Sequence, residues 1–288
     1  MIPPAFDYAV PKTLNDAVAL LGQNPEAKVL AGGHSLIPMM KFRLASPPLL
    51  VDINRLEGLA YIREEDGWLK IGALTREADL DGSDLIRQKY PLLADTARTI
   101  ADPLVRNMAT VGGNLAHADP ANDHPATMLA YGAQVVATGS GGERTIPIGQ
   151  FFEGPFQTVL AHDEILTEIR IPAAKSNSGG AYFKLERKVG DFATAAVAAQ
   201  ITIGATGKCE DAGIGLTNVG LTPIKATKAE EALKGKPLDD ATIRQAAQLA
   251  SEAAEPVGDQ RGSEDYKRAL VKTLTVRALR KALERAKS

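Results

Sequence analysis

Two stretches with paired glycines constrain this chain more than any other feature: AGGHS at residues 31–35 and TVGGN at residues 110–114. They lie about eighty residues apart, and each joins two glycines to side chains that carry a hydroxyl, amide or imidazole group. Glycine permits positive φ and close approach to the main chain, so backbone N–H groups in such a loop can converge on a phosphate. Two such loops predict an extended anionic ligand, such as a dinucleotide pyrophosphate, held from both sides.

The common nucleotide-binding motifs are missing from the sequence. A Rossmann unit needs G-x-G-x-x-G, and a P-loop needs G-K-[ST] after its glycines; neither pattern occurs. Further polar groups follow the second stretch in NLAHADPANDH, residues 114–124. Among them, Asp123 can accept hydrogen bonds from ribityl or ribose hydroxyls, and Asn114 can both donate and accept. The glycine stretches therefore predict a nucleotide site of a less common type.

Composition and charge narrow the class of protein. The 288 residues are 44% hydrophobic and 24% charged, which is typical of a soluble globular chain with one large or two medium domains. A net charge of −2 argues against non-specific nucleic-acid binding, and no apolar run is long enough to predict a membrane span. The single cysteine, Cys209, excludes an internal disulfide and an iron–sulfur cluster ligated by this chain alone. Without a signal-peptide pattern at the N-terminus, we expect a cytoplasmic protein.

Hydrophobic periodicity predicts a mixed α/β or α+β N-terminal domain followed by a smaller α+β domain. The expected elements are a helix at 14–21 capped by Thr13 and ended by Gly22, strands at 28–31, 49–53 and 68–74, a helical stripe at 83–100 interrupted by Pro91, and a hairpin of segments 133–137 and 144–146 across 139–142. The segment 173–180 is linker-like, so we predict domains 1–172 and 173–288. The second domain starts with strands, becomes helical near Lys225 and ends with a helix from Glu264.

Several spaced segments resemble one family in the correct order. AGGHSLIP (31–38) and TVGGNLAHADPANDHPA (110–126) resemble the two FAD-binding segments of the flavoprotein subunits of molybdenum hydroxylases, and within that family those of aerobic carbon monoxide dehydrogenases. The similarity extends along the chain through the opening IPPAFDYAVPKTLNDAVALL, then VDINRL, IADPLVRN, KLERKVGDFATAA and GLTNVG. Ordered matches over the whole chain are far more specific than one glycine loop.

The resemblance implies a fold and a cofactor. It implies an α+β FAD-binding domain of the vanillyl-alcohol-oxidase (PCMH) type, with subdomains at about 1–55 and 56–172, and a C-terminal α+β domain with a three-stranded antiparallel sheet and a helical bundle. Carried over position by position, it assigns FAD contacts to Ala31, Gly32, Gly33, His34, Ser35, Leu36, Thr110, Val111, Gly112, Gly113, Asn114, Asp123, Leu166, Lys184 and Phe192. Near relatives often have Tyr where Phe192 stands; Phe keeps the packing but loses the hydroxyl.

The resemblance also implies a role within a complex. This chain would carry FAD as an electron-transfer subunit, with chemistry on the cofactor and no catalytic side chain of its own. Electrons would come from iron–sulfur clusters on a small [2Fe-2S] subunit and pass to quinone, NAD or oxygen. The substrate would bind a large molybdenum-cofactor subunit, in a dimer of heterotrimers.

Other functions remain open from the residues. The chain could be a self-sufficient flavin oxidase, a scaffold that has lost FAD, or the FAD subunit of a xanthine, aldehyde or N-heterocycle dehydrogenase instead of a CO dehydrogenase. By composition, His117, Asp119, Asp123 and His124 resemble a metal cluster. Because Asp and His in loops are more often turn-formers and caps, we expect no metal.

Overall fold

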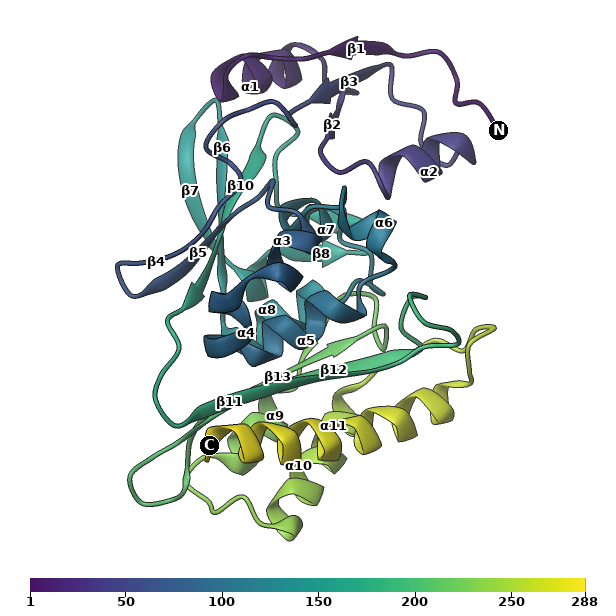
Figure 1. Cartoon of the computed structure of the whole chain (residues 1–288). Helices are drawn as coiled ribbons and strands as arrows, with labels where there is room; N and C mark the ends of the chain where they lie inside the picture. Colours follow the sequence, from purple (N-terminus) through teal and green to yellow (C-terminus); the bar gives the residue numbers. More distant parts are fainter. Residues whose placement is uncertain (288) are drawn as a thin grey trace.

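The computed structural model describes residues 1–287 and arranges them in three layers (Figure 1). The first layer is a parallel three-stranded sheet in the order β1-β3-β2, with two helices. Its elements are β1 (Asp7–Ala9), α1 (Leu14–Gln23), β2 (Lys28–Leu30), α2 (Leu36–Lys41) and β3 (Leu49–Asp52). As predicted, Thr13 caps α1, in a reciprocal capping box with Asp16. The helix continues past Gly22 by one residue, and β2 leads directly into the first glycine stretch.

The middle layer is an antiparallel five-stranded sheet in the order β4-β5-β10-β6-β7, with helices packed beside it. Its strands are β4 (Ile62–Glu65), β5 (Trp68–Gly72), β6 (Gln134–Gly139), β7 (Gly142–Pro147) and β10 (Ile165–Pro172), and its helices are α3 (Glu77–Gly82), α4 (Asp84–Lys89), α5 (Pro91–Thr99), α6 (Pro103–Arg106), α7 (Val111–His117) and α8 (His124–Tyr131). A short 3₁₀ turn (Ile148–Gln150) and the strand pair β8 (Phe152–Gly154) and β9 (Gln157–Thr158) follow β7. The expected hairpin is confirmed as β6–β7. Pro91 does divide the helical stripe, since it is the first residue of α5.

The third layer is an antiparallel sheet in the order β11-β12-β13-β14, covered by three helices. Its elements are β11 (Ser178–Leu185), β12 (Ala195–Ile203), β13 (Cys209–Thr217), β14 (Ile224–Lys225), α9 (Thr227–Leu233), α10 (Asp240–Ala253) and α11 (Glu264–Ala286). The two-residue β14 adds a fourth strand to the three expected. We expected a linker at 173–180, but its last three residues, 178–180, belong to strand β11. Gly180 is also in contact with the last helix, because Arg285 of α11 donates a hydrogen bond to its carbonyl oxygen at 2.6 Å.

Strand β12 connects this sheet to the rest of the protein. One side of it, with Val197 and Ile201, packs into the core formed with α9, α10 and α11. The other side, with Ala196 and Ala198, packs against Leu92 of α5 and α8. Both faces of the sheet are therefore buried, one against α10 and α11 and the other against α5 and α8 of the middle layer (Figure 1). None of the helices within residues 1–287 has the length and apolarity needed to cross a membrane.

Candidate functional site

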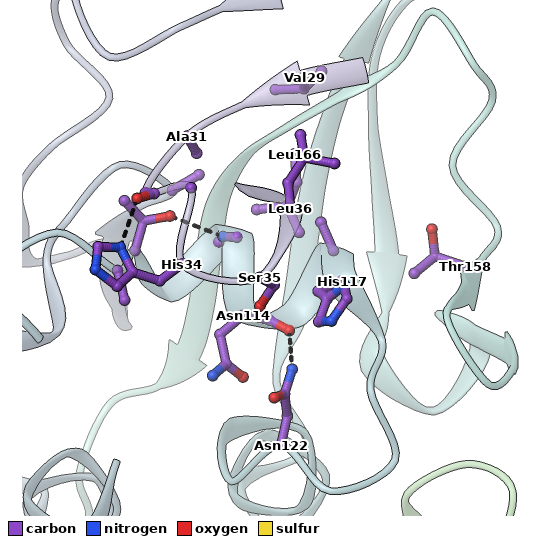
Figure 2. Close-up of a pocket in the computed structure, with 18 of the residues that line it drawn as sticks. Val29, Ala31, His34, Ser35, Leu36, Asn114, His117, Asn122, Thr158 and Leu166 are labelled. Atoms are coloured by element: carbon purple, nitrogen blue, oxygen red, sulfur yellow. Dashed lines mark hydrogen bonds between the residues drawn. The ribbon is translucent and has the colours of Figure 1, made fainter. Parts of the chain in front are cut away.

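A cavity of about 860 Å³ lies where the three layers meet. Both glycine stretches line it, together with Leu166 of β10, Lys184 of β11 and Phe192 of the β11–β12 loop. Figure 2 shows the first stretch and Asn114 on neighbouring walls of this cavity, with Leu166 close by. Its volume is that of a pocket for a small molecule or cofactor. Of the residues predicted to contact FAD, all except Val111 line this cavity.

The first glycine stretch forms the connection between β2 and α2. Gly33 has φ of +76°, the left-handed region that favours glycine. Throughout the part of the chain that the structure describes, the backbone N–H groups of residues 32–36 donate to no protein acceptor. The His34 ring Nδ1 lies 2.9 Å from the Gly32 carbonyl oxygen, a contact within the turn itself. These unpaired donors border the cavity, so they are available to an anionic ligand.

We expected the second glycine stretch to be a loop, but it forms the first turn of helix α7. Thr110 caps the helix and accepts from the Gly113 N–H at 3.2 Å. The N–H groups of Val111 and Gly112 donate to Thr75 and Ala73 at 3.0 Å, and that of Asn114 to Thr110 at 2.9 Å. All four amides at 111–114 therefore already have protein acceptors.

Close packing explains the glycine at the start of this helix. A Cβ added to Gly112 would lie 2.5 Å from the Ala73 Cβ, so α7 contacts the chain after β5 only because this side chain is missing. Val111 is fully buried in the core of the middle layer and does not line the cavity. Its predicted FAD contact is not supported by this position, because both its side chain and its N–H face the protein.

A set of hydrogen bonds through Asn54 and Arg76, here called the brace, joins the two stretches, and the sequence did not predict it. Asn54 Nδ2 donates to the Ala31 carbonyl oxygen at 2.7 Å, and Arg76 donates to Asn54 Oδ1 at 2.7 Å. Arg76 also donates to the Met108 carbonyl oxygen, just before the second stretch. Asn54 lies in the segment VDINRL that carried the family resemblance, but nothing in the sequence connected it to Arg76. The brace fixes the first stretch relative to α7.

Asp123 and Lys184 meet at the edge of the cavity, although 61 residues separate them. Lys184 Nζ lies 2.9 Å from Asp123 Oδ2, and Tyr182 donates to Asp123 Oδ1 at 2.5 Å. Lys184 also donates to the Thr99 carbonyl oxygen at 3.1 Å. Burial raises the pKa of the Asp123 carboxyl, while the ammonium and the phenol oppose that rise. The sequence named both residues separately, and the structure joins them into one buried ion pair.

The remaining polar residues divide between the cavity and the core. Asn114 lines the cavity, and its buried Oδ1 has no hydrogen-bond partner within residues 1–287. His117 lines the cavity and lies 5.1 Å from the Phe156 ring, and burial lowers its pKa. His124 instead contacts Glu77 at 2.7 Å in the interior. Among the described residues, no three His, Cys, Asp or Glu side chains are grouped to hold a metal ion.

The site therefore has the properties of a binding cavity. Within residues 1–287, it offers main-chain donors beside Gly33 that have no protein acceptor, the side-chain amide of Asn114 and the ammonium of Lys184. An extended ligand with phosphate and hydroxyl groups fits these donors and acceptors.

Comparison with known proteins agrees with this geometry. Residues 4–174 match the family model described as FAD binding domain in molybdopterin dehydrogenase, and residues 180–282 match that of the CO dehydrogenase flavoprotein C-terminal domain. The chain is 46% identical to the carbon monoxide dehydrogenase medium chain of Hydrogenophaga pseudoflava, over 99% of each chain. It is 40% identical to the alpha subunit of the 6-hydroxypseudooxynicotine dehydrogenase complex of Paenarthrobacter nicotinovorans, over 100% of this chain and 97% of that one.

A solved structure shows the same fold. The chain superposes with a TM-score of 0.96, at 47% identity and 99% coverage of both chains, on carbon monoxide dehydrogenase from Hydrogenophaga pseudoflava lacking the Mo-pyranopterin moiety of its cofactor. The predicted α+β fold, with an FAD-binding part and a C-terminal part, is thereby confirmed. This chain belongs to the family of FAD-binding medium subunits of molybdenum hydroxylases.

Proposed function

We propose that this chain holds FAD as the electron-transfer subunit of a molybdenum hydroxylase complex whose substrate is carbon monoxide. The observation that carries the proposal is the run of unpaired N–H groups at 32–36, beside a cavity that also contains Lys184 and Asn114. Bound FAD supplies one- and two-electron transfer between partner redox centres and an external acceptor. The protein's residues bind and orient the cofactor, and Leu166 and Phe192 add apolar walls.

The two glycine stretches divide the binding task in this proposal. The amides of 32–36 contact the pyrophosphate, since residues 1–287 supply them with no acceptor. Gly113 and Asn114 contribute the facing wall, where the missing side chain of Gly113 leaves room for the ligand. Asp123 and Lys184 together contact a polar part of FAD, because their ion pair borders the cavity.

The same proposal covers the partner subunits of this chain and the place of the complex in the cell. We infer a large molybdenum-cofactor subunit and a small [2Fe-2S] subunit as partners, arranged as a dimer of heterotrimers in the cytoplasm, with quinone, NAD or oxygen as acceptor. The support is that relatives similar over nearly the whole chain are the medium chain or a subunit of such dehydrogenases. The similarity to a subunit of a 6-hydroxypseudooxynicotine dehydrogenase keeps an N-heterocycle or related dehydrogenase as the second candidate.

We further propose that the FAD-binding part spans 1–172, with subdomains 1–55 and 56–172, and that the C-terminal domain spans 173–288. This division is supported by the end of β10 at Pro172 and the start of β11 at Ser178. The separation of the β1-β3-β2 sheet from the five-stranded sheet supports the two subdomains.

Purification of the native complex tests the proposal. We expect this chain to co-purify with a molybdenum subunit and an iron–sulfur subunit, to release FAD on denaturation, and to be reduced by carbon monoxide. Reduction by an N-heterocycle and not by carbon monoxide would favour the second candidate. A colourless chain that also takes up no added FAD would contradict both.

A further inference from the structure

The β11–β12 loop, residues 186–194, reaches the cavity from the C-terminal layer. Gly190, Asp191 and Phe192 of this loop line the cavity, and the Phe192 side chain is 48% exposed. The Asp191 side chain, by contrast, is only 10% exposed, and its contacts decide where the loop lies.

Asp191 holds the loop through both of its carboxylate oxygens. Oδ1 accepts from the Phe192 N–H at 2.8 Å and from Arg261 Nη2 at 3.1 Å, and Oδ2 accepts from Arg187 Nε at 3.0 Å. Burial would raise the pKa of this carboxyl, but the hydrogen bonds from Arg187, Arg261 and the Phe192 N–H lower it to about 2. The carboxylate is therefore charged at neutral pH, and two guanidinium groups meet there.

Arg261 comes from a turn between α10 and α11 that is itself held firmly. Asp259 Oδ1 accepts from the backbone N–H groups of Arg261 and Gly262 at 2.8 and 3.2 Å. Lys267 of α11, only 2% exposed, donates to Asp259 Oδ2 at 2.8 Å and to the Val257 carbonyl oxygen at 2.9 Å. A continuous set of contacts thus runs from α11 through Asp259 and Arg261 to Asp191 and the Phe192 N–H.

We propose that Arg261 is a positioning residue for the bound cofactor: through Asp191 it fixes the β11–β12 loop so that Phe192 covers part of the cavity opening. The inference rests on the proposed binding of FAD. Arg187 is 55% exposed, so its contact with Asp191 is weakened by solvent, whereas Arg261 is 26% exposed and comes from a braced turn. Arg261 therefore determines how far solvent and external acceptors reach the flavin.

The test compares Arg261→Gln, Arg261→Lys and a control, Arg244→Gln, in the full-length chain. Arg244 pairs with Asp240 at 2.9 Å on α10, within the same sheet-and-helix layer, and among residues 1–287 it forms no hydrogen bond or ion pair with the loop. In the apo-chain we expect trypsin to cut after Arg187 or Lys188 roughly fivefold faster in Arg261→Gln, because cleavage follows local opening. In the FAD-loaded chain we expect its iodide quenching constant for flavin fluorescence to rise about threefold, because the loop no longer screens the flavin from solvent. The control should match the wild type in both measurements.

The conservative variant separates positioning from general destabilisation. Arg261→Lys keeps the charge but loses the planar fork, so its cleavage and quenching should fall between the wild type and Arg261→Gln. Wild-type cleavage and quenching in Arg261→Gln would overturn the inference. Failure of the wild-type chain to take up FAD would overturn the proposed function as well, whereas normal uptake with unchanged quenching would overturn this inference alone.

Discussion

Each of the two glycine stretches joins a pair of glycines to polar side chains, yet their main-chain N–H groups differ in whether the protein supplies acceptors. Within residues 1–287, the main-chain N–H groups at 32–36 have no protein acceptor, whereas each of those at 111–114 has one. Gly33 is required by its positive φ, and Gly112 by its contact with Ala73. Paired glycines can thus leave the main chain open to a ligand or let two pieces of main chain pack together. In this protein the first stretch serves the ligand, and the start of the second serves the fold.

The largest effect is expected on the stability of a variant at Gly112. Gly112→Ala should lower the free energy of unfolding by about 2 kcal/mol, because overpacking against Ala73 costs about 3 kcal/mol and the better helix propensity of alanine returns about 1. Thermal or urea unfolding of the apo-chain measures this loss. Gly82→Ala is the control: Gly82 also lies in a helix, but its Cβ would meet nothing within 4 Å. Equal stability of the two variants would show that the contact with Ala73 is not limiting.

The next effect concerns FAD affinity, in addition to a loss of stability that the control variant shares. Gly33→Ala should raise the dissociation constant for FAD about tenfold, because a side chain at this φ strains the turn that presents the amides, by about 1–2 kcal/mol. Titration of the apo-chain with FAD measures it. Gly58→Ala introduces the same strain at φ +78° in open space away from the cavity, so it should reduce stability alone. If both variants bound FAD equally, the first stretch would not contact the phosphates.

The smallest effect is expected at the cap of α7. Thr110→Ala removes the acceptor for the Gly113 N–H and should lower the free energy of unfolding by about 1 kcal/mol. Thr13→Ala, which removes the corresponding cap of α1, should cost a similar amount. FAD affinity should change less than about twofold in Thr110→Ala, a difference of less than 0.5 kcal/mol. A loss of affinity as large as that of Gly33→Ala would place Thr110 among the principal ligand contacts.

Local signals explain what the sequence could predict. Thr13 with Asp16 specifies the start of α1, the apolar alternation around 134–146 specifies a hairpin, and the acidic residues at Glu264 and Asp265 mark the start of α11. Each of these features depends on neighbours in the chain, so its residues carry the information.

Contacts between distant residues explain what the sequence could not predict. Glycine is a poor helix former, so the sequence of the second stretch does not predict that α7 starts there. The reason for Gly112 is its contact with Ala73, which only the folded structure shows. The Asp123–Lys184 pair depends on the C-terminal sheet packing against the middle layer, and the Asp191–Arg261 pair joins two loops of the C-terminal layer that lie 70 residues apart in the chain. Periodicity along one segment contains no information about such pairs, and the family resemblance named Asp123 and Lys184 only as separate contacts.

Amide hydrogen exchange in the apo-chain and the FAD-loaded chain, resolved to single residues, tests the contrast between the stretches most directly. The amides of 32–36 should exchange rapidly without FAD and become protected when it binds, since only the ligand offers them acceptors. The amides of 111–114 should be protected in both states. The account would be contradicted if FAD protected 111–114 and left 32–36 exchanging as in the apo-chain.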